Sequence, residues 1–266
     1  MNRLILLSGA GLSAESGVPT FRDSGGLWDN HSVDEVCNLD NFLPNYVKVN
    51  DFYNKRRTDL ANVEPNLAHE IIATLQSSYP EGVVVNITTN VDDLLERAGC
   101  ISVQHLHGKL TEVVYNYKEL DQDLPVDIGY TAVSDGTLSG VKYPVKPNVV
   151  FFGEMAPEYG EYYELCDSLT SEDLVVVVGS SDLVVPFGLN ALYGASFYKH
   201  SEDRPVQIIR VNPDVIEESS VHPEDNIIAQ SYTLQTGTTA VEWFSDEGNI
   251  DMIHEHLKGS VNYIKV

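Results

Sequence analysis

The sequence predicts an α/β fold in which a doubly wound parallel, Rossmann-like sheet carries a small inserted domain. Short apolar runs recur along the chain, and each is long enough for one buried strand: Leu4–Leu7, Val83–Ile87, Leu174–Val178 and Val206–Val211. Helix-like segments separate these runs, which is typical of a parallel sheet covered on both faces. From Leu110 to Pro147 the pattern changes to alternating β-type residues, tyrosines and turn pairs, which indicates a small, mostly β insertion.

Composition limits the classes of protein that the chain can belong to. Its 266 residues, 42% of them hydrophobic, are enough for one core with a subdomain. No apolar run approaches the roughly 20 residues of a membrane span, and no signal-peptide pattern follows Met1. Three widely spaced cysteines suit a reducing cytoplasm, and a formal charge of -24 argues against nucleic-acid binding, which needs a basic face. We therefore expect a cytoplasmic protein that binds neither nucleic acid nor membrane.

The first strand ends in a turn of small residues. After Leu4–Leu7 the chain runs through Ser8 into Gly9-Ala10-Gly11, whose backbone can turn tightly and approach a ligand closely. Ser13 is expected to be the N-cap of a helix whose unpaired N–H groups face an anion. A strand, a tight turn and a helix start together predict a dinucleotide phosphate site. Because the third glycine of the Rossmann pattern is missing, the glycines alone fit a plain strand-to-helix turn equally well.

The later elements continue the alternation of helices and strands. The acidic segment Asp29–Asp40 is expected to be a loop with short helical turns. Expected helices cover Asp51–Leu60 with Asn50 or Asp51 as cap, Pro65–Gln76, Val91–Ala98 up to Gly99, and the segment after Ala240. Expected strands cover Val103–His105, Asn148–Phe152, where the chain resumes the core sheet, and part of Ile227–Leu234. Polar residues that follow strands are site candidates, because ligands of such sheets bind at the strands' C-terminal ends.

The stretch from Gly9 to Trp28, GAGLSAESGVPTFRDSGGLW, resembles the signature of the sirtuins, which are NAD-dependent protein-lysine deacylases. Later blocks follow in that family's order: Thr89–Asp92, His107-Gly108, Val149–Glu154, Gly179–Ser181 and Val211–Pro213. The resemblance covers nearly the whole chain. It implies one catalytic domain over 1–266, with a large Rossmann-like part from 1–30, 66–108 and 148–266 and a small part from 31–65 and 109–147.

The resemblance also implies NAD as the cofactor and assigns the residues that bind it: Gly9, Ala10, Gly11, Ser13, Glu15, Phe21, Arg22, Trp28, Thr89, Asn90, Val91, Asp92, Gly179, Ser180, Ser181, Asn212 and Ala240. In the implied reaction the acyl oxygen of an acylated lysine displaces nicotinamide from NAD, and the products are free lysine and O-acyl-ADP-ribose. Asn90 and Asp92 hold the nicotinamide amide, and His107 acts as the base. From the residues alone, Asn90 equally fits a helix cap and Asp92 a surface carboxylate.

Two histidines compete for the role of base. A histidine has an ordinary pKa near 6.5, so it can accept a proton at neutral pH. A single histidine is nevertheless more often a packed or surface residue than a catalytic one. The resemblance favours His107, because a His-Gly pair at this place is the family's catalytic pair. His105, two residues earlier, is the rival.

The substrate side is assigned to two segments. By resemblance, an acylated-lysine protein or peptide adds as a strand beside Val149, Val150, Phe151, Phe152, Gly153 and Glu154, with the two phenylalanines lining the lysine tunnel. Tyr53 and Arg56 share a helix face at i and i+3 and form a potential carboxylate clamp. In the short-acyl subfamily such a pair recognises succinyl- or malonyl-lysine. The alternatives are a core aromatic residue at one of positions 151 and 152 and a solvated basic helix face at 53 and 56.

The chain departs from the family pattern at three points. Lys109 to Asn148 contains no Cys and no His, so the structural zinc of most sirtuins is not expected. Thr89 replaces a usual glutamine, and Cys37 replaces a small alanine and could narrow the acyl pocket.

The Thr-Thr-Asn run keeps open a second function, that of a sirtuin-like NAD hydrolase without a protein substrate. A non-catalytic NAD-sensing or partner-binding module is a third interpretation. The sequence leaves the oligomeric state undetermined.

Overall fold

The computed structural model describes residues 2–20, 31–115, 124–133, 136–138, 141–197, 206–217 and 223–261. Its central feature is a six-stranded sheet with the strand order β11-β10-β9-β1-β2-β3. Every recorded pairing in this sheet is parallel. The strands are β1 (Arg3–Ser8), β2 (Val84–Thr88), β3 (Gln104–His105), β9 (Asp173–Val178), β10 (Gln207–Val211) and β11 (Leu234–Gln235). The chain leaves β1 first to one side and later to the other, so the doubly wound fold class is confirmed.

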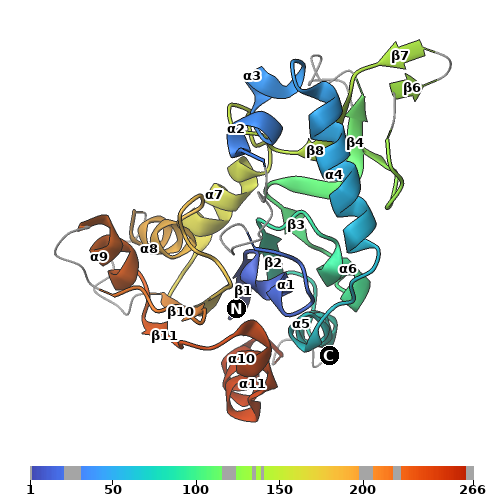
Figure 1. The fold of residues 1–266 in the computed structure, drawn as a ribbon. Helices are drawn as coiled ribbons and strands as arrows, with labels where there is room; N and C mark the ends of the chain where they lie inside the picture. The colour runs from blue at the N-terminus through green and yellow to red at the C-terminus, as the bar shows by residue number, and fades with distance from the viewer. Residues whose placement is uncertain are drawn as a thin grey trace.

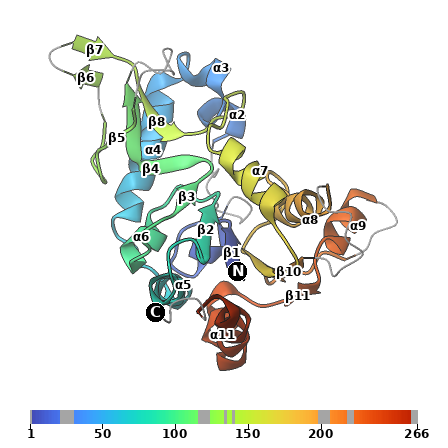
Figure 2. The same ribbon diagram turned by 180° about the vertical axis from the view of Figure 1, so that it is seen from behind.

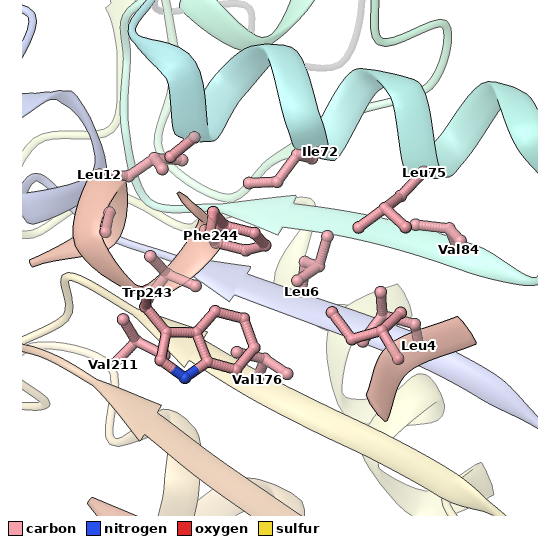
Figure 3. Close-up of a cluster of buried hydrophobic side chains, with 14 of the residues drawn as sticks. Leu4, Leu6, Leu12, Ile72, Leu75, Val84, Val176, Val211, Trp243 and Phe244 are labelled. Carbon is pink, nitrogen blue, oxygen red and sulfur yellow. The ribbon is translucent and has the colours of Figure 1, made fainter. Parts of the chain in front are cut away.

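Helices cover both faces of this sheet (Figure 1). One face packs on α5 (Leu67–Ser78), α6 (Leu94–Ala98), α10 (Ala240–Ser245) and α11 (Glu247–Val261). The other packs on α7 (Tyr159–Ser168), α8 (Phe187–Phe197) and α9 (Pro223–Gln230). Figure 3 shows the first of these cores, where Ile72 from α5 and Phe244 from α10 point toward Leu6 of β1. Alternate residues of β1 enter the two cores, because successive side chains of a strand point to opposite faces.

A smaller antiparallel sheet lies beyond the edge of the main one, beside α4 (Figure 2). It has the order β5-β4-β8 and consists of β4 (Gly108–Tyr115), β5 (Val126–Asp127) and β8 (Val145–Val149), while β6 (Gly136–Leu138) and β7 (Val141–Tyr143) form a separate hairpin. The helices α2 (Val33–Val36), α3 (Leu39–Phe42) and α4 (Tyr46–Leu60) pack on it through a third apolar core. The expected β-rich insertion is present, and the exact boundaries of the two parts stay a prediction.

Several expected elements differ in place or length. Asn148–Phe152 does not rejoin the core sheet, because its strand is β8, which ends at Val149 and pairs antiparallel with β4. The first half of Ile227–Leu234 belongs to helix α9, which ends at Gln230, and the strand begins only at Leu234. The helix expected from Asp51 already begins at Tyr46, and the one expected from Val91 begins at Leu94. Apolar periodicity locates each segment but does not specify its strand partner or its first turn.

None of the helices among the described residues is both long and apolar enough to cross a lipid bilayer.

Gly108 joins the two sheets and has no room for a side chain. Its φ is +78°, and a Cβ added there would lie 2.1 Å from the carbonyl oxygen of Asn148. Gly82 also has a positive φ, of +81°, but a Cβ there would meet no atom within 4 Å. The two glycines therefore separate the cost of the backbone conformation from the cost of the clash.

We predict that Gly108→Ala lowers the free energy of unfolding much more than Gly82→Ala does. Gly82→Ala should cost about 1–2 kcal/mol for the left-handed conformation. Gly108→Ala should cost about 1–3 kcal/mol beyond that, because the strand of Asn148 must move. Urea unfolding of the two variants measures the difference, and equal losses would show that β4 and β8 are not in direct backbone contact at Gly108.

Candidate active site

The loops that follow the central strands of the main sheet meet at the C-terminal ends of these strands. The amide of Gly9 donates to the carbonyl of Val178 at 2.9 Å, and the amide of Gly11 donates to that of Gly179 at 2.9 Å. A Cβ added to Gly11 would lie 2.6 Å from the Cα of Gly179, so the two backbones touch. The sheet therefore brings the glycine turn after β1 against the turn after β9. Ala10, between the glycines, is the N-cap of the short helix α1 (Gly11–Ala14).

Ser13 lies inside α1 and is not its N-cap, which corrects the expectation from the sequence. Its side chain is fully buried, and its Oγ donates to Oδ2 of Asp92 at 2.9 Å. The same oxygen accepts from Nδ2 of Asn90 at 3.2 Å and lies 3.4 Å from Nε2 of His69. Ser13 thus joins the two polar residues that the sequence assigns to nicotinamide binding.

His69 on α5 completes this network, and the sequence analysis did not identify it. The backbone N–H of Asn66 donates to its Nδ1 at 3.2 Å, so in the neutral ring Nε2 carries the proton and faces Ser13. Burial lowers the pKa of His69 to about 4, which keeps the ring neutral at neutral pH. Asn66 and His69 form the capping box of α5. The Asn-x-x-His spacing could have located the cap, but not the contact with Ser13.

Asp92 and Asn90 are both buried in the loop after β2. Oδ1 of Asp92 accepts the backbone N–H of Leu94 at 3.2 Å, at the start of α6. Asp92, and not Asn90, therefore contacts the first turn of that helix. Burial raises the pKa of Asp92, and the hydrogen bonds from Ser13 and Leu94 oppose that rise. Val91 is half-buried between them, and its carbonyl accepts the N–H of Leu110 at 2.7 Å.

The two candidate histidines have different surroundings. His105 is buried, with Nδ1 2.8 Å from the carbonyl of Asn90 and Nε2 2.8 Å from Oε1 of Glu96. Burial raises the pKa of Glu96, but the contacts with His105 and Lys109 outweigh it and bring that pKa to about 2. Glu96 and the Asn90 carbonyl therefore occupy both ring nitrogens of His105, which suits a structural role.

His107 is half-buried in the turn between β3 and β4. Its Nε2 lies 2.8 Å from the hydroxyl of Tyr159, the first residue of α7. Burial lowers the pKa of His107, and a hydrogen bond with the Thr89 backbone partly offsets that change. The ring is therefore neutral at neutral pH and able to accept a proton. Thr89 itself is held by its own N–H, which donates to the Ser8 carbonyl at 2.9 Å.

The expected adenosine-binding residues follow β9 and β10. Nδ2 of Asn212 donates to the carbonyl of Ser180 at 2.9 Å, and Oγ of Ser180 donates to Oδ1 of Asp182 at 3.2 Å. Asp182, which the sequence analysis missed, is buried and has the left-handed φ of 58°, a conformation that no other non-glycine residue adopts in the described ranges. Burial raises its pKa, and the hydroxyl of Tyr232 donates to its Oδ2. Ser181 is half-buried next to this buried carboxylate.

Two further expected cofactor residues, Glu15 and Ala240, come from α1's C-terminal end and from the start of α10. Oε2 of Glu15 accepts the N–H of Val241 at 3.1 Å, next to the buried Ala240, and so links the segment after α1 to α10. Phe21, Arg22 and Trp28 lie outside the described residues.

The backbone of the expected substrate strand is hydrogen-bonded to two other segments of the chain. The N–H of Val150 donates to the carbonyl of His107 at 3.0 Å, and that of Phe152 donates to the carbonyl of Cys37 at 2.9 Å. Phe151 is buried and stacks on Tyr53, with ring centroids 5.7 Å apart, whereas Phe152 is 53% exposed. The two phenylalanines therefore differ, and Phe151 is a core residue.

A buried ion pair closes the end of this segment. Nζ of Lys146 lies 2.9 Å from Oε2 of Glu154, and both side chains are almost fully buried. The same carboxylate oxygen accepts the N–H of Phe151 at 2.7 Å, and Nζ donates to the carbonyl of Val149 at 2.6 Å. Glu154 therefore fixes the turn through Gly153, whose φ is 88°.

The potential carboxylate clamp lies on α4. Tyr53 is buried, and its hydroxyl shares a hydrogen bond with the thiol of Cys37. Arg56 is half-buried, with its guanidinium 3.1 Å from the ring centroid of Phe52 and Nη1 donating to the carbonyl of Phe52 at 2.9 Å. Burial lowers the pKa of Arg56 to about 10, so the side chain is charged at neutral pH. Cys37 is far from Tyr53 and Arg56 in sequence, but its hydrogen bond with Tyr53 places it beside this pair in the structure.

Comparison with known proteins identifies the family. The model of the Sir2 family matches residues 9–186. The chain belongs to the Sir2 family. An NAD-dependent protein deacylase of Helicobacter hepaticus is 42% identical over 200 residues, which cover 70% of this chain and 77% of that protein.

Solved structures of Sir2 proteins share the fold. An ADP-ribose complex of a mutated Sir2 homologue has a TM-score of 0.73 at 28% identity and covers 99% of this chain and 94% of its own. A Sir2 complex with a p53 peptide and NAD+ has a TM-score of 0.69 at 25% identity, covering 93% and 94%.

The zinc site of most Sir2 proteins does not fit this chain. The segment from Lys109 to Asn148 offers neither cysteine nor histidine, the ligands of a structural zinc. In the described part of the chain, no three His, Cys, Asp or Glu side chains group closely enough to hold a metal ion. Apolar contacts of β4 and β8 with α4 pack this region, with Leu110, Val114 and Val149 buried against the helix.

We predict that Ser13→Ala destabilises the fold far more than Ser16→Ala does. Removing Oγ of Ser13 leaves buried groups of Asp92 and Asn90 without this partner, which costs about 1–3 kcal/mol. Oγ of Ser16 is also buried but has no hydrogen-bond partner among the described residues, so its removal should be nearly neutral. Urea unfolding measures both variants, and equal free-energy losses would mean that the Ser13 network contributes little.

Proposed function

We propose that this chain is an NAD-dependent protein-lysine deacylase that removes acetyl, malonyl or succinyl groups. One observation carries the proposal. A neutral, half-buried histidine bonds to the backbone of Thr89, which directly precedes Asn90 of the buried Asn–Ser–Asp network, within a chain of the Sir2 family. The name of the Helicobacter hepaticus relative and the p53-peptide and NAD+ complex of a Sir2 protein support the same activity.

The residues at the C-terminal ends of the central strands fit NAD. Gly11 and Gly179, whose backbones touch, place no side chain at their point of contact, which suits a close approach of phosphates. In the proposal, Asn90 and Asp92 hold the nicotinamide amide, while Ser180, Ser181 and Asn212 hold the adenosine half. NAD supplies an electrophilic ribose carbon with nicotinamide as its leaving group. Asp92 contributes as a hydrogen-bonded acceptor whose position Ser13 fixes.

His107 is the proposed base. Burial lowers its pKa, so its Nε2 can accept the proton of a ribose hydroxyl at neutral pH. His105 is not proposed for this role, because Glu96 and the carbonyl of Asn90 occupy its two ring nitrogens. The acylated peptide binds along Val149–Glu154, where the ion pair of Lys146 and Glu154 stiffens the segment.

The protein is also proposed to act in the cytoplasm without nucleic acid. Its cysteines are unpaired and buried, which suits a reducing compartment. Its charge of -24 repels phosphate backbones.

A preference for acidic acyl groups is supported by Arg56. A partly buried cation at neutral pH favours an anionic partner, and Tyr53 lies one helical turn away on the same face. One contact opposes this preference: the Tyr53 hydroxyl bonds to Cys37, so the clamp requires that hydrogen bond to rearrange.

NAD hydrolysis without a protein substrate is the competing function. Arg56 argues against NAD hydrolysis, because a hydrolase has no acyl group to recognise.

We predict that His107→Tyr abolishes formation of O-acyl-ADP-ribose while the fold and NAD binding are kept. The side chain lies in a half-buried turn, and the base is needed only after nicotinamide has been displaced. Calorimetry with NAD measures binding, and mass spectrometry with an acetyl-lysine peptide measures product. Undiminished product formation would exclude His107 as the base.

We predict that Arg56→Met removes demalonylase and desuccinylase activity but spares deacetylation. A charge-assisted bond to the acyl carboxylate is worth roughly 1.5–3 kcal/mol, or about ten- to a hundredfold in kcat/KM. Lys55→Met is the matched control, because Lys55 is exposed on the same helix and pairs with Asp59. If Arg56→Met lowers kcat/KM equally for acetyl and succinyl peptides, Arg56 is structural and the clamp is wrong.

A further inference from the structure

A polar side chain within hydrogen-bond distance of the proposed base comes from a helix that carries none of the expected site residues. The hydroxyl of Tyr159 lies 2.8 Å from Nε2 of His107, within hydrogen-bond distance, and the two ring centroids are 6.0 Å apart. Tyr159 is half-buried, and burial raises the pKa of its hydroxyl, so it stays protonated at neutral pH. It is therefore available as a hydrogen-bond donor.

The helix that presents Tyr159 is firmly anchored. Tyr162, one turn along α7, is fully buried against Phe187, and its hydroxyl accepts from Nδ2 of Asn190 at 3.2 Å. At the start of α7, Nε2 of Gln104 donates to the carbonyl of Glu158 at 3.3 Å. The helix is thus tied both to α8 and to β3, the strand before His107. A contact held from two packed elements positions a side chain more sharply than one on a free loop.

The hydrogen bonds of His107 select one tautomer of its neutral ring. The contact with the Thr89 backbone raises the pKa of His107, so it is a bond in which a ring N–H donates to the carbonyl oxygen. A neutral imidazole has one N–H and one acceptor nitrogen. Nε2 faces Tyr159, so Nδ1 is the nitrogen left for Thr89, and Nε2 is the acceptor of the tyrosine O–H.

We infer that Tyr159 is a positioning residue that holds His107 with Nε2 unprotonated and directed away from the Thr89 loop. The inference rests on the proposed role of His107 as base. An arriving ribose hydroxyl replaces the tyrosine hydroxyl at the same lone pair, so one O–H donor is exchanged for another. The ring then needs neither a tautomer change nor a rotation before it accepts the proton, which is the benefit of a preorganised base.

The direct test is nitrogen-15 NMR of the free protein, without NAD or peptide, at mildly alkaline pH. The His107 ring signals are assigned by their loss in His107→Gln. We expect Nε2 of the wild type to show the shift of an unprotonated imidazole nitrogen and Nδ1 that of a protonated one. Tyr159→Phe should bring the two shifts together, as a mixture of tautomers does. A protonated Nε2 in the wild type, or an unchanged spectrum in Tyr159→Phe, overturns the inference.

Kinetics with NAD and an acetyl-lysine peptide give the second readout. Loss of one hydrogen bond should lower kcat for Tyr159→Phe about two- to tenfold and leave both KM values within about twofold. Tyr163→Phe is the matched control, because Tyr163 packs on Tyr159 at 5.9 Å between ring centroids but is 48% exposed, and it should behave as wild type. A higher kcat in Tyr159→Phe would make the contact an inhibitory latch, and a loss beyond a hundredfold would make Tyr159 a direct proton carrier; either result overturns a positioning role.

The two experiments separate this inference from the proposed function. If the wild type deacylates none of the peptides, the proposed function fails, while the NMR experiment still reports the His107 tautomer in the free protein. If deacylation proceeds and the tautomer does not depend on Tyr159, only the positioning role fails.

Discussion

The arrangement of the site depends on the direct backbone contact between Gly11 and Gly179. These residues follow neighbouring strands, and their separation leaves no room for a Cβ on either. The contact lets α1 turn in directly after β1, so that Ser13 reaches the loop after β2 and bonds to Asp92. A side chain at Gly11 or Gly179 would push the turns apart and separate Ser13 from its two partners. The two glycines thus allow the polar network to form, because they have no side chain that would hold the two turns apart.

Burial then determines the charge state of the site. It raises the pKa of Asp92 and lowers the pKa values of His69, His107 and Arg56. The two histidines are therefore neutral at neutral pH, whereas the arginine remains charged because its pKa of about 10 is still well above that range. The overall charge of -24 is a weaker influence on an anionic acyl group, since salt screens it beyond about 8 Å. In the proposed function, acyl selectivity therefore depends on local contacts such as that of Arg56 rather than on the overall charge.

The sequence was sufficient to predict the fold class and to predict that the candidate residues lie at the C-terminal ends of the strands. Both follow from alternating strands and helices and from the position of each motif after a strand, as at Gly9, Thr89 and Gly179. It could not place Ser13, because a serine near a helix start fits a cap and a buried hub equally well. His69 and Tyr159 escaped notice because each meets its partner more than 50 residues away in sequence. Asn148–Phe152 was assigned to the wrong sheet because an apolar run does not specify its strand partner.

The most direct test of the central claim is the stoichiometry of products by mass spectrometry of the purified protein with NAD and acetyl-, malonyl- or succinyl-lysine peptides. A deacylase must couple the two substrates, since the acyl group leaves lysine only by transfer to the ribose. We expect nicotinamide, free-lysine peptide and O-acyl-ADP-ribose in equal amounts, and little nicotinamide when peptide is omitted. Release of nicotinamide at the same rate without any peptide, with ADP-ribose as the only other product, would contradict the account and establish an NAD hydrolase.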